Sequence, residues 1–394
     1  MKMIVQKYGG ATLAEPAKIK AVAQRIAEQA RLGTKLVIVV SAMGKTTNTL
    51  IDLANQISLN PHQREMDMLL TAGERISMAL MSIALNDLGC SAISFTGSQA
   101  GILTNSSHVN AFIVDIKAFR AQEALDHGKV VILAGFQGVC PATKEITTLG
   151  RGGSDTSAVA MAAYFGADRC EILKDVPAVF TADPNVVKNA KPLKELNYDQ
   201  LMDMTFWGAK VLHYRSVELA KIRSVKLYIG PASTKTSDGT IVQEGLNMFE
   251  SSKALSLNSH ETVLQISTAT SSGILIDSLQ KYFESKQIAF PQLLDLERRD
   301  KTTMLLLTGP QEMMSAIRNA LSKHPDFNLS STEFSTVTLT CTGSTAPEIP
   351  HQVMKALADQ KIHAHKMMIN AMSVTVLVES AARKETMQAM HGLI

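Results

Sequence analysis

The residues best suited to chemistry lie in the segment TTLGRGGSDTSA, residues 147–158. The pair Gly152-Gly153 has no Cβ atoms, so its backbone N–H groups can approach an anion closely. Ser154 or Asp155 can cap the helix predicted to follow, and a helix N-terminus favours a bound phosphate or carboxylate. Arg151 offers a planar guanidinium suited to a carboxylate. By spacing alone, a glycine turn beside a surface arginine explains the segment equally well.

A lysine and two glycines near the start of the chain form a second candidate group. Lys7 stands at the end of a predicted strand and is followed by Gly9 and Gly10. A lysine in this place can neutralise a phosphoryl group during its transfer. Taken alone, a solvated lysine beside a turn is the simpler interpretation. We expect Lys7 to be exposed, so that its replacement by alanine would lower turnover and leave folding intact.

Two further segments carry polar groups in mainly apolar surroundings. The segment SAMGKTTN, residues 41–48, places hydroxyl groups and backbone donors after a predicted buried strand. A loop that only caps the following helix would explain this segment equally well. Glu74 lies in TAGER, where its carboxylate could bind a substrate ammonium group or could be an exposed residue at a helix start. The sequence contains neither the GxxxxGKS/T motif nor the protein-kinase motifs.

The elements that must position these residues alternate between strand and helix over roughly the first 240 residues. Strands are predicted at residues 4–5, 36–40, 130–134 and 170–173, and helices at residues 15–30 and 155–165. This alternation predicts an α/β fold with an open, mostly parallel sheet sandwiched by helices. Ligands bind such sheets where loops leave the carboxyl ends of the strands, and the glycine-rich segments lie at such ends.

The last third of the chain follows a different plan. Residues 233–238 read as a loop, and two shorter units follow, around residues 263–307 and 337–378. Their spacing of about 75 residues is consistent with a duplicated small unit of strands and a helix. Neither unit contains an obvious chemical motif. We therefore expect this third to serve regulation or assembly.

The composition excludes several classes of protein. The formal net charge is +3, which argues against a general nucleic-acid binder. The four cysteines are scattered without a CxxC pair, so neither a zinc site nor a disulfide framework is indicated. The N-terminal residues are too short and polar a stretch for a signal peptide, and no apolar run approaches a membrane span. We expect a soluble, cytoplasmic protein with no nucleic-acid or membrane partner.

Taken together, these segments resemble the aspartokinases of the amino-acid kinase superfamily. The ordered matches within residues 1–245 are KYGG, SAMGKTT, REMDMLLTAGERIS, FTGSQAGILT, AGFQGV, TTLGRGGSDTSAVA, TADP and GAKVL. The last third is similar to the paired ACT regulatory domains of that family. The resemblance implies an amino-acid kinase catalytic domain at residues 1–245 and two ferredoxin-like α+β ACT domains at residues 246–335 and 336–394, whose boundaries can interleave.

The resemblance also implies an activity and its residues. The γ-phosphoryl group of MgATP would pass to the β-carboxylate of L-aspartate, with Lys7 and Asp155 as the catalytic residues. Glu74 would bind the ammonium group of aspartate and Arg151 its α-carboxylate. The full aspartate-binding set would be Thr47, Glu74, Arg151, Gly152, Gly153 and Ser154. The ATP-binding set would be Lys7, Gly9, Gly10, Ser41, Lys174, Asp175, Phe180, Asp183 and Lys210.

Cofactors and partners follow from the same resemblance. Mg²⁺ would arrive with ATP, so no protein side chain is predicted as a metal ligand, and no tightly bound cofactor is expected. A homo-oligomer formed through the ACT domains is expected. The product, 4-phospho-L-aspartate, would lead toward lysine, threonine and methionine, and lysine or threonine would be the expected feedback inhibitors.

The nucleotide segment departs from the family pattern. Residues 174–185 read KDVPAVFTADPN, with Pro177-Ala178 in place of an acidic–glycine turn, and Phe180 lacks the usual hydroxyl group. Asn185 replaces an arginine expected to contact phosphate, which could cost about 1.5–3 kcal/mol of nucleotide affinity. Our hypothesis is that the nearby charge of Lys174 compensates for this loss.

The first ACT unit departs as well. Residues 267–273 read STATSSG and residues 288–291 read IAFP, where the family carries polar groups that hold an effector. Feedback inhibition by lysine or threonine is therefore predicted to be weak or altered. Two alternatives to an active aspartokinase stay open: a non-catalytic regulatory homologue with an impaired nucleotide site, and a kinase for another acidic amino acid such as glutamate.

Overall fold

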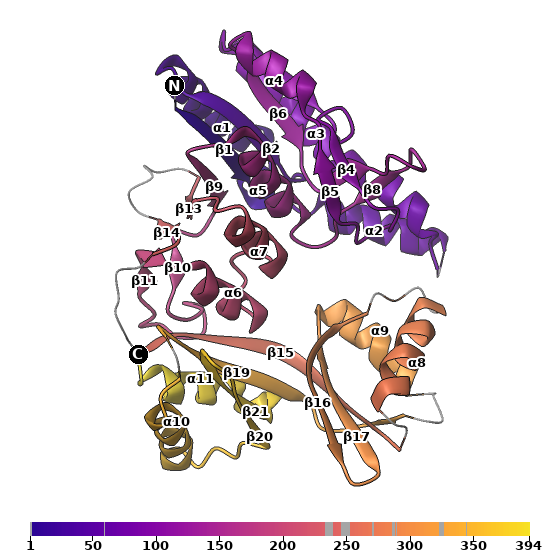
Figure 1. The fold of residues 1–394 in the computed structure, drawn as a ribbon, viewed down its shortest axis with the longest axis vertical. Helices are drawn as coiled ribbons and strands as arrows, with labels where there is room; N and C mark the ends of the chain where they lie inside the picture. The colour runs from indigo at the N-terminus through magenta and orange to yellow at the C-terminus, as the bar shows by residue number, and fades with distance from the viewer. Residues whose placement is uncertain are drawn as a thin grey trace. The chain divides into compact units, whose positions relative to one another are not determined.

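The computed structural model describes residues 2–58, 60–232, 239–245, 253–269, 272–285, 288, 290–322, 327–343 and 345–394. The chain divides into two compact units (Figure 1). The first comprises Met1–Val179, Pro192–Met202 and Lys210–Asn247, and the second comprises Phe180–Lys191, Asp203–Ala209 and Met248–Ile394. The predicted loop at residues 233–238 lies outside the described residues.

The first unit is built on an eight-stranded sheet with the strand order β12-β14-β13-β9-β1-β2-β6-β3. Its strands are β1 (Met3–Tyr8), β2 (Lys35–Val40), β3 (Ala92–Phe95), β6 (Val130–Ala134), β9 (Arg169–Lys174), β12 (Glu195–Leu196), β13 (Leu227–Pro231) and β14 (Thr240–Val242). β14 runs antiparallel to β13, and the other described pairings of this sheet are parallel. The predicted open, mostly parallel sheet is confirmed.

A smaller sheet and several helices complete the first unit. The smaller sheet has the order β5-β4-β7-β8. Its strands are β4 (Ile102–Thr104), β5 (Ile113–Ile116), β7 (Gln137–Val139) and β8 (Ile146–Thr148). The helices are η1 (Gly10–Leu13), α1 (Pro16–Arg31), α2 (Thr46–Ile57), α3 (Gln63–Asp87), α4 (Phe119–Asp126), α5 (Gly153–Phe165) and α7 (Tyr214–Ile222). Three short elements contain or adjoin the points at which the chain passes from one unit to the other: β10 (Val179–Phe180), β11 (Pro192–Leu193) and α6 (Tyr198–Phe206).

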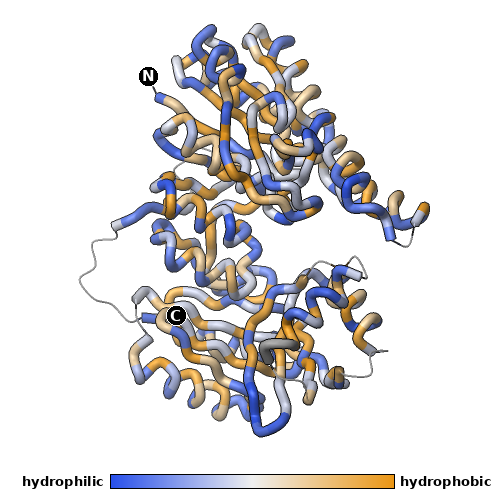
Figure 2. The backbone as a smooth tube through the Cα atoms, turned by 45° about the vertical axis from the view of Figure 1, so that its right-hand side comes forward, coloured by the Kyte–Doolittle hydropathy of each residue, from blue (hydrophilic) through white to orange (hydrophobic). Residues whose placement is uncertain are grey.

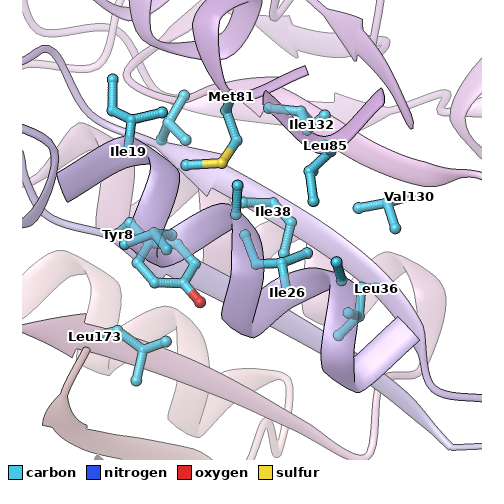
Figure 3. Close-up of a cluster of buried hydrophobic side chains, with 14 of the residues drawn as sticks. Tyr8, Ile19, Ile26, Leu36, Ile38, Met81, Leu85, Val130, Ile132 and Leu173 are labelled. Atoms are coloured by element: carbon cyan, nitrogen blue, oxygen red, sulfur yellow. The ribbon is translucent and has the colours of Figure 1, made fainter. Parts of the chain in front are cut away.

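The core of the first unit forms because α1 is apolar along one face. Pro16 starts the helix, where its missing N–H has no partner to lose. Ile19, Val22 and Ile26 follow at spacings of three and four, and they pack with Ile38 of β2 in one buried cluster (Figure 3). Burying one such side chain contributes about 1.5–3 kcal/mol to stability. Along the helices, apolar and polar residues alternate as expected for helices with one buried face (Figure 2).

Helix α3 is the longest helix among the described residues and crosses the core of the first unit. By length and composition alone it would be long enough to span a membrane. It packs against β2, β3, β6 and β8, and its buried residues include Asp67 and Glu74. These contacts are those of a core helix.

The second unit is built on an antiparallel sheet with the order β16-β17-β15-β19-β21-β20, and β18 also pairs with β15. Its strands are β15 (Ala254–Thr268), β16 (Gln292–Arg299), β17 (Thr302–Thr308), β18 (Asn328–Leu329), β19 (Phe334–Cys341), β20 (Lys366–Ile369) and β21 (Ser373–Glu379). The first half of β15 pairs with β19, and its second half pairs with β17. One long strand therefore joins the two short units read from the sequence.

Two helix pairs cover this sheet, together with the short turn η2 (Ser380–Ala382). Helices α8 (Ser272–Ser285) and α9 (Gln311–Leu321) share a core with β15 and β17, and helices α10 (Glu348–Asp359) and α11 (Arg383–His391) share another with β19 and β21. The pairing of helices supports two related halves. The predicted boundary between residues 335 and 336 falls inside β19, and the division into two ACT domains stays a prediction.

Candidate active site

The carboxyl ends of four parallel strands meet at one edge of the main sheet. In the register of the strands, Tyr8 of β1 lies beside Val40 of β2 and Leu173 of β9, and Val40 lies beside Ala134 of β6. The residues that follow these ends are therefore neighbours: Gly9 and Gly10, Ser41, Gly135, and Lys174. The tertiary structure thus brings together loops that are far apart in the sequence.

A buried ion pair lies at this edge. Lys7 Nζ is 2.6 Å from Asp155 Oδ1, and the two side chains are 8% and 7% exposed. Helix α5, which carries Asp155 in its first turn, packs against β1 and so covers the lysine. The prediction that Lys7 is exposed is therefore wrong.

Two cations keep Asp155 ionised. Burial alone would raise the pKa of the Asp155 carboxyl, but the charges of Lys7 and Lys174 outweigh burial and hold this pKa below its ordinary value. Burial lowers the pKa of Lys174, and the negative charge of Asp155 partly opposes this lowering. The Lys174 Nζ donates to the carbonyl oxygen of Val211. Two cations facing one carboxylate give this patch an affinity for a further anion.

The first two loops are held together by their backbones. Ser41 N donates to Tyr8 O over 3.2 Å, and Gly44 N donates to Gly10 O over 3.0 Å. A Cβ atom on Gly10 would lie 2.7 Å from the carbonyl oxygen of Ala42, so only glycine fits this contact. Gly9 leaves space in front of Lys7, because a Cβ at Gly9 would be 3.9 Å from Lys7 Nζ. Gly10 thus allows the two loops to pack closely, and Gly9 leaves the lysine ammonium uncovered on its side.

Glu74 is a buried carboxylate with one oxygen unused. It is 4% exposed, and its Oε1 accepts from Ala42 N over 3.1 Å. Among the described residues no hydrogen-bond partner reaches its buried Oε2. Burial raises the pKa of Glu74 to about 7, and the nearby charge of Lys7 opposes this rise. An acceptor in such surroundings is suited to a cationic ligand group, as predicted for an ammonium.

The segment around Arg151 forms a tight glycine turn before α5. Gly150 and Gly152 adopt φ angles of +73° and +69°, which L residues with side chains rarely adopt. Arg151 is exposed on this turn, while Ser154 and Asp155 are buried in the first turn of α5. A Cβ atom on Gly135, after β6, would lie 2.9 Å from Ser154 Oγ, so the serine lies against the loop of the neighbouring strand.

The remaining predicted site residues are divided between the two units. Thr47 is half-buried in the first turn of α2, and Asp175 and Lys210 are exposed residues of the first unit. Phe180 and Asp183 belong to the second unit, where Asp183 Oδ1 accepts from Asn185 N and Nδ2 over 2.9 and 3.0 Å. A nucleotide-binding role for these residues stays a prediction.

The sequence analysis missed two residues that frame the site. His213, the N-cap of α7, lies against Gly152, and its pKa is lowered by burial and by Arg215, while Asp155 opposes this. Asp67 of α3 is fully buried and accepts from Thr148 Oγ1 over 2.6 Å. An acidic residue seven positions before Glu74, inside an apolar helix, was the available signal for Asp67. His213 follows GAKVL directly but has no distinguishing spacing.

The arrangement is suited to two charged ligands. Lys7 and Lys174 can attract a polyanion to the strand ends. Glu74 offers a carboxylate oxygen and Arg151 a guanidinium, which together match a small molecule with an ammonium and a carboxylate group. Among the described residues no group of three or more His, Cys, Asp or Glu side chains is placed to hold a metal ion.

A cavity of about 500 Å³ lies away from these residues. It is lined by Phe112 and by residues of β5, α5 and α7, including Tyr164 and Arg215. None of the predicted site residues lines it. The sheet edge, with its convergence of ionic groups, is therefore the candidate site.

Comparisons with known proteins agree with this geometry. A model of the amino acid kinase family matches residues 2–231. An aspartokinase from Mycolicibacterium smegmatis is 51% identical over 243 residues, which is 62% of this chain and 58% of that protein's own length. The chain therefore matches little more than half the length of that relative.

Two further proteins match over the whole length. An aspartokinase from Bacillus sp. (strain MGA3) is 36% identical over 99% of this chain and 97% of its own length. The crystal structure of E. coli aspartokinase III in complex with aspartate and ADP matches with a TM-score of 0.81 and 19% identity, covering 100% of both chains. At that identity, the structural match shows the fold alone.

Proposed function

Because the chain belongs to the amino acid kinase family, and within it to the aspartokinases, we propose that it transfers the γ-phosphoryl group of ATP to the side-chain carboxylate of L-aspartate. The observation that carries this proposal is the convergence of the Lys7–Asp155 pair and Glu74 at one sheet edge. The solved neighbour holds aspartate and ADP, which supports the same substrates here.

The reaction needs no general base from the protein. An oxygen of the β-carboxylate, ionised near neutral pH, forms a bond to the γ-phosphorus. The bond between the γ-phosphorus and the oxygen bridging to the β-phosphate breaks, and ADP leaves with the electron pair. The products are 4-phospho-L-aspartate and ADP. Positioning and neutralisation of charge are therefore what the protein must supply.

Lys7 supplies the charge nearest to the transfer. Its ammonium group is held by Asp155 and has Gly9 beside it, so a phosphate oxygen can approach the lysine without a side chain in the way. Asp155 fixes the direction of the lysine and is itself fixed by the first turn of α5. Lys174 adds a second positive charge beside Asp155. Its compensation for the arginine missing at Asn185 stays a hypothesis.

Aspartate would be held at its ammonium group and at its α-carboxylate. Glu74 Oε2 would accept from the ammonium group, and Arg151 would bind the α-carboxylate. Ser154 and the N–H group of Gly152, at the start of α5, would direct the β-carboxylate toward the phosphate. Gly153 would contribute by shaping the turn, because its own N–H donates to Gly150 O over 3.0 Å. Thr47 would add a hydroxyl contact from α2.

ATP would occupy the other side of the strand ends. Gly9, Gly10 and Ser41 would contact its phosphates. The remaining predicted nucleotide residues are Lys174, Asp175, Phe180, Asp183 and Lys210. Mg²⁺ would arrive on the phosphates of ATP and screen their charge, and we assign no residue of the chain to it.

Regulation and assembly are proposed for the second unit. The second unit supports paired ACT domains, through which the chain would form a homo-oligomer and bind lysine or threonine. Residues 270, 271 and 289, within the segments that depart from the family, lie outside the described residues. Weak or altered feedback therefore stays a prediction. A cytoplasmic location also stays a prediction. Activity at millimolar lysine or threonine tests the first, and strong inhibition by either amino acid would refute it.

Trapping of the acyl phosphate with hydroxylamine tests the proposed function. Purified protein with MgATP should yield aspartyl hydroxamate with L-aspartate and much less product with L-glutamate. Product with glutamate alone would establish the other acidic substrate. Absence of aspartate-dependent ADP release and of hydroxamate, even at high protein concentration, would favour the non-catalytic homologue.

A further inference from the structure

Helix α7 begins directly beside the turn that carries Arg151. His213 caps this helix, its Nδ1 accepting from Arg215 N over 3.4 Å. A Cβ atom on Gly152 would collide with the Cβ of His213. The start of the helix and the glycine turn are thus packed against each other, with the His213 side chain directly against Gly152.

The guanidinium of Arg215, in the first turn of α7, reaches the same region. Its Nη1 donates to Leu149 O over 3.0 Å and to Asn110 Oδ1 over 2.9 Å, and its Nη2 donates to Ala111 O over 2.9 Å. The side chain is partly buried and lies over the ring of Phe112, with 4.2 Å between Cζ and the ring centre. All three acceptors are neutral oxygens. Two of them belong to the loop with Asn110 and Ala111 and one to Leu149 before the glycine turn, so the Arg215 side chain joins these two segments.

The glycine turn needs such support. Leu149 stands two residues before Arg151, and the glycines on either side of Arg151 have the positive φ angles given above. Glycine restricts the backbone less than any other residue, so the turn has little stiffness of its own. A Cβ atom on Gly150 would lie 2.9 Å from Asn110 Oδ1, which shows how closely the supporting loop is packed.

The supporting loop is itself fixed. Ala111 N donates to Thr148 O over 2.8 Å, at the end of β8. Asp67 of α3 accepts from Val109 N over 3.0 Å as well as from Thr148. Arg215 therefore closes a connection that runs from α3 through the loop to the turn.

We propose that Arg215 is a positioning residue, which holds the Leu149–Gly153 turn so that Arg151 is directed at the α-carboxylate of the substrate. Arg151 is exposed and stands on this turn between two glycines with positive φ angles. The inference rests on the proposed function for the identity of the substrate. It assigns Arg215 to aspartate binding, with no contact of its own to aspartate or ATP.

Steady-state kinetics of Arg215→Met test the proposal. Methionine keeps an apolar side chain over Phe112 but has no donor for the three oxygens. The KM for aspartate should rise roughly ten- to hundredfold, because small displacements of a binding group have effects of this size. The KM for ATP should stay within about twofold. Arg215→Lys, which can keep part of the donor set, should fall between wild type and Arg215→Met.

Arg223→Met is the matched control. Arg223 is an exposed residue at the C-cap of α7 and lines the same cavity as Arg215. It should leave both KM values unchanged. An equal rise in the KM for ATP and the KM for aspartate in Arg215→Met would indicate a general structural defect and overturn the proposal.

A double-mutant cycle with Arg151→Ala separates positioning from an independent role. If Arg215 acts through Arg151, Arg215→Met should add almost nothing to the KM for aspartate once Arg151 is alanine. Effects that simply add would show that Arg215 acts by another route.

Hydrogen exchange of the ligand-free protein gives a readout that does not depend on the reaction. Backbone amides of residues 149–153 should exchange faster in Arg215→Met than in wild type, while Arg223→Met should match wild type. If Arg215→Met does not fold, Arg215→Lys carries the same comparison. Unchanged exchange would overturn the inference, whereas failure of wild type to form aspartyl hydroxamate would overturn the proposed function alone.

Discussion

Two buried acidic residues, Asp155 and Glu74, determine much of the chemistry at the scale of single residues. Asp155 is compensated by Lys7 and Lys174, so it is ionised. Glu74 has one backbone donor and a free oxygen, so its charged form is poorly supported. The pKa of the Asp155 carboxyl is thus lowered and that of the Glu74 carboxyl is raised, although both lie near Lys7, because their other neighbours and hydrogen bonds differ.

Removal of Lys7 should cost both stability and turnover. In Lys7→Ala the buried Asp155 loses its closest cation, and breaking such a pair costs about 3–5 kcal/mol in free energy of unfolding. Loss of the charge at the phosphoryl group should lower kcat roughly 10²–10³-fold. Urea unfolding at pH 7 and hydroxamate kinetics measure the two effects.

Lys35→Ala is the matched control for this variant. Lys35 pairs with Asp126 over 3.0 Å at an exposed site, and such pairs contribute less than about 1 kcal/mol. The double variant Lys7→Ala with Asp155→Asn should recover stability without activity. Unaltered stability of Lys7→Ala would contradict the buried pair.

Glu74 should make aspartate binding depend on pH near neutrality. With a pKa of about 7, its carboxylate becomes available for an ammonium group as pH rises through that value. The kcat/KM for aspartate should therefore rise between roughly pH 6 and pH 8 in wild type. In Glu74→Gln it should be low and should lose this rise. A Glu74→Gln profile that parallels wild type would remove Glu74 from the binding step.

The same group predicts a change of stability with pH. The folded-state pKa is raised from 4.5 to about 7, so the folded state holds the proton more tightly than the unfolded state. Stability from this group is present below pH 4.5 and is lost as pH rises to about 7. The full loss is about 3 kcal/mol. Glu74→Gln should gain stability over wild type at pH 8 relative to pH 5, as measured by urea unfolding.

At the scale of elements, α3 connects the two ends of the proposed aspartate site. Glu74 lies two helical turns after Asp67 on the same face, because seven residues make close to two turns. Asp67 binds Thr148 at the end of β8, just before the turn with Arg151. The distance between Glu74 and Arg151 is therefore set through one helix.

Asp67→Asn should loosen this connection. Its oxygens accept from Thr148, Val109 and His108, and an asparagine would turn its NH₂ group toward at least one of these donors. Stability should fall by about 1–3 kcal/mol, and the KM for aspartate should rise. Asp87→Asn, an exposed change at the end of the same helix, should do neither. A normal KM in Asp67→Asn would limit Asp67 to a role in stability.

At the scale of the whole molecule, each unit is held together by contacts between distant parts of the chain. In the second unit, Asp203 accepts from Thr340 Oγ1 over 2.6 Å and from Ser373 Oγ over 2.9 Å. The short segment Asp203–Ala209 thus belongs to the unit of β19 and β21 although it lies far from them in sequence.

Asp203→Ala should weaken this unit. Two hydroxyl groups on buried residues would lose their acceptor, which costs about 1–3 kcal/mol. Hydrogen exchange should accelerate in β19 and β21, and the exposed change Asp359→Ala on α10 should have no such effect. Unchanged exchange in both strands would show that these bonds are dispensable.

Local patterns predicted the central strands β1, β2, β6 and β9 and the helices α1 and α5, but not the smaller sheet. The apolar runs at residues 36–40 and 130–134 became buried strands, since a continuous apolar run fits the interior of a parallel sheet. The first short unit was predicted to begin only around residue 263, so the first half of β15, which pairs with β19, was missed. Likewise, Thr336 and Thr338 look like solvent-facing residues, yet both are fully buried.

The sequence by itself determined the α/β plan, the glycine turns and the residue types at the strand ends, because these depend on local periodicity and on what a backbone can do without a Cβ. The tertiary structure alone decided which groups meet and in what charge state. The burial of Lys7, the raised pKa of Glu74 and the support of Arg151 by Arg215 all come from packing between distant segments, which changes the solvation and the neighbours of each charge.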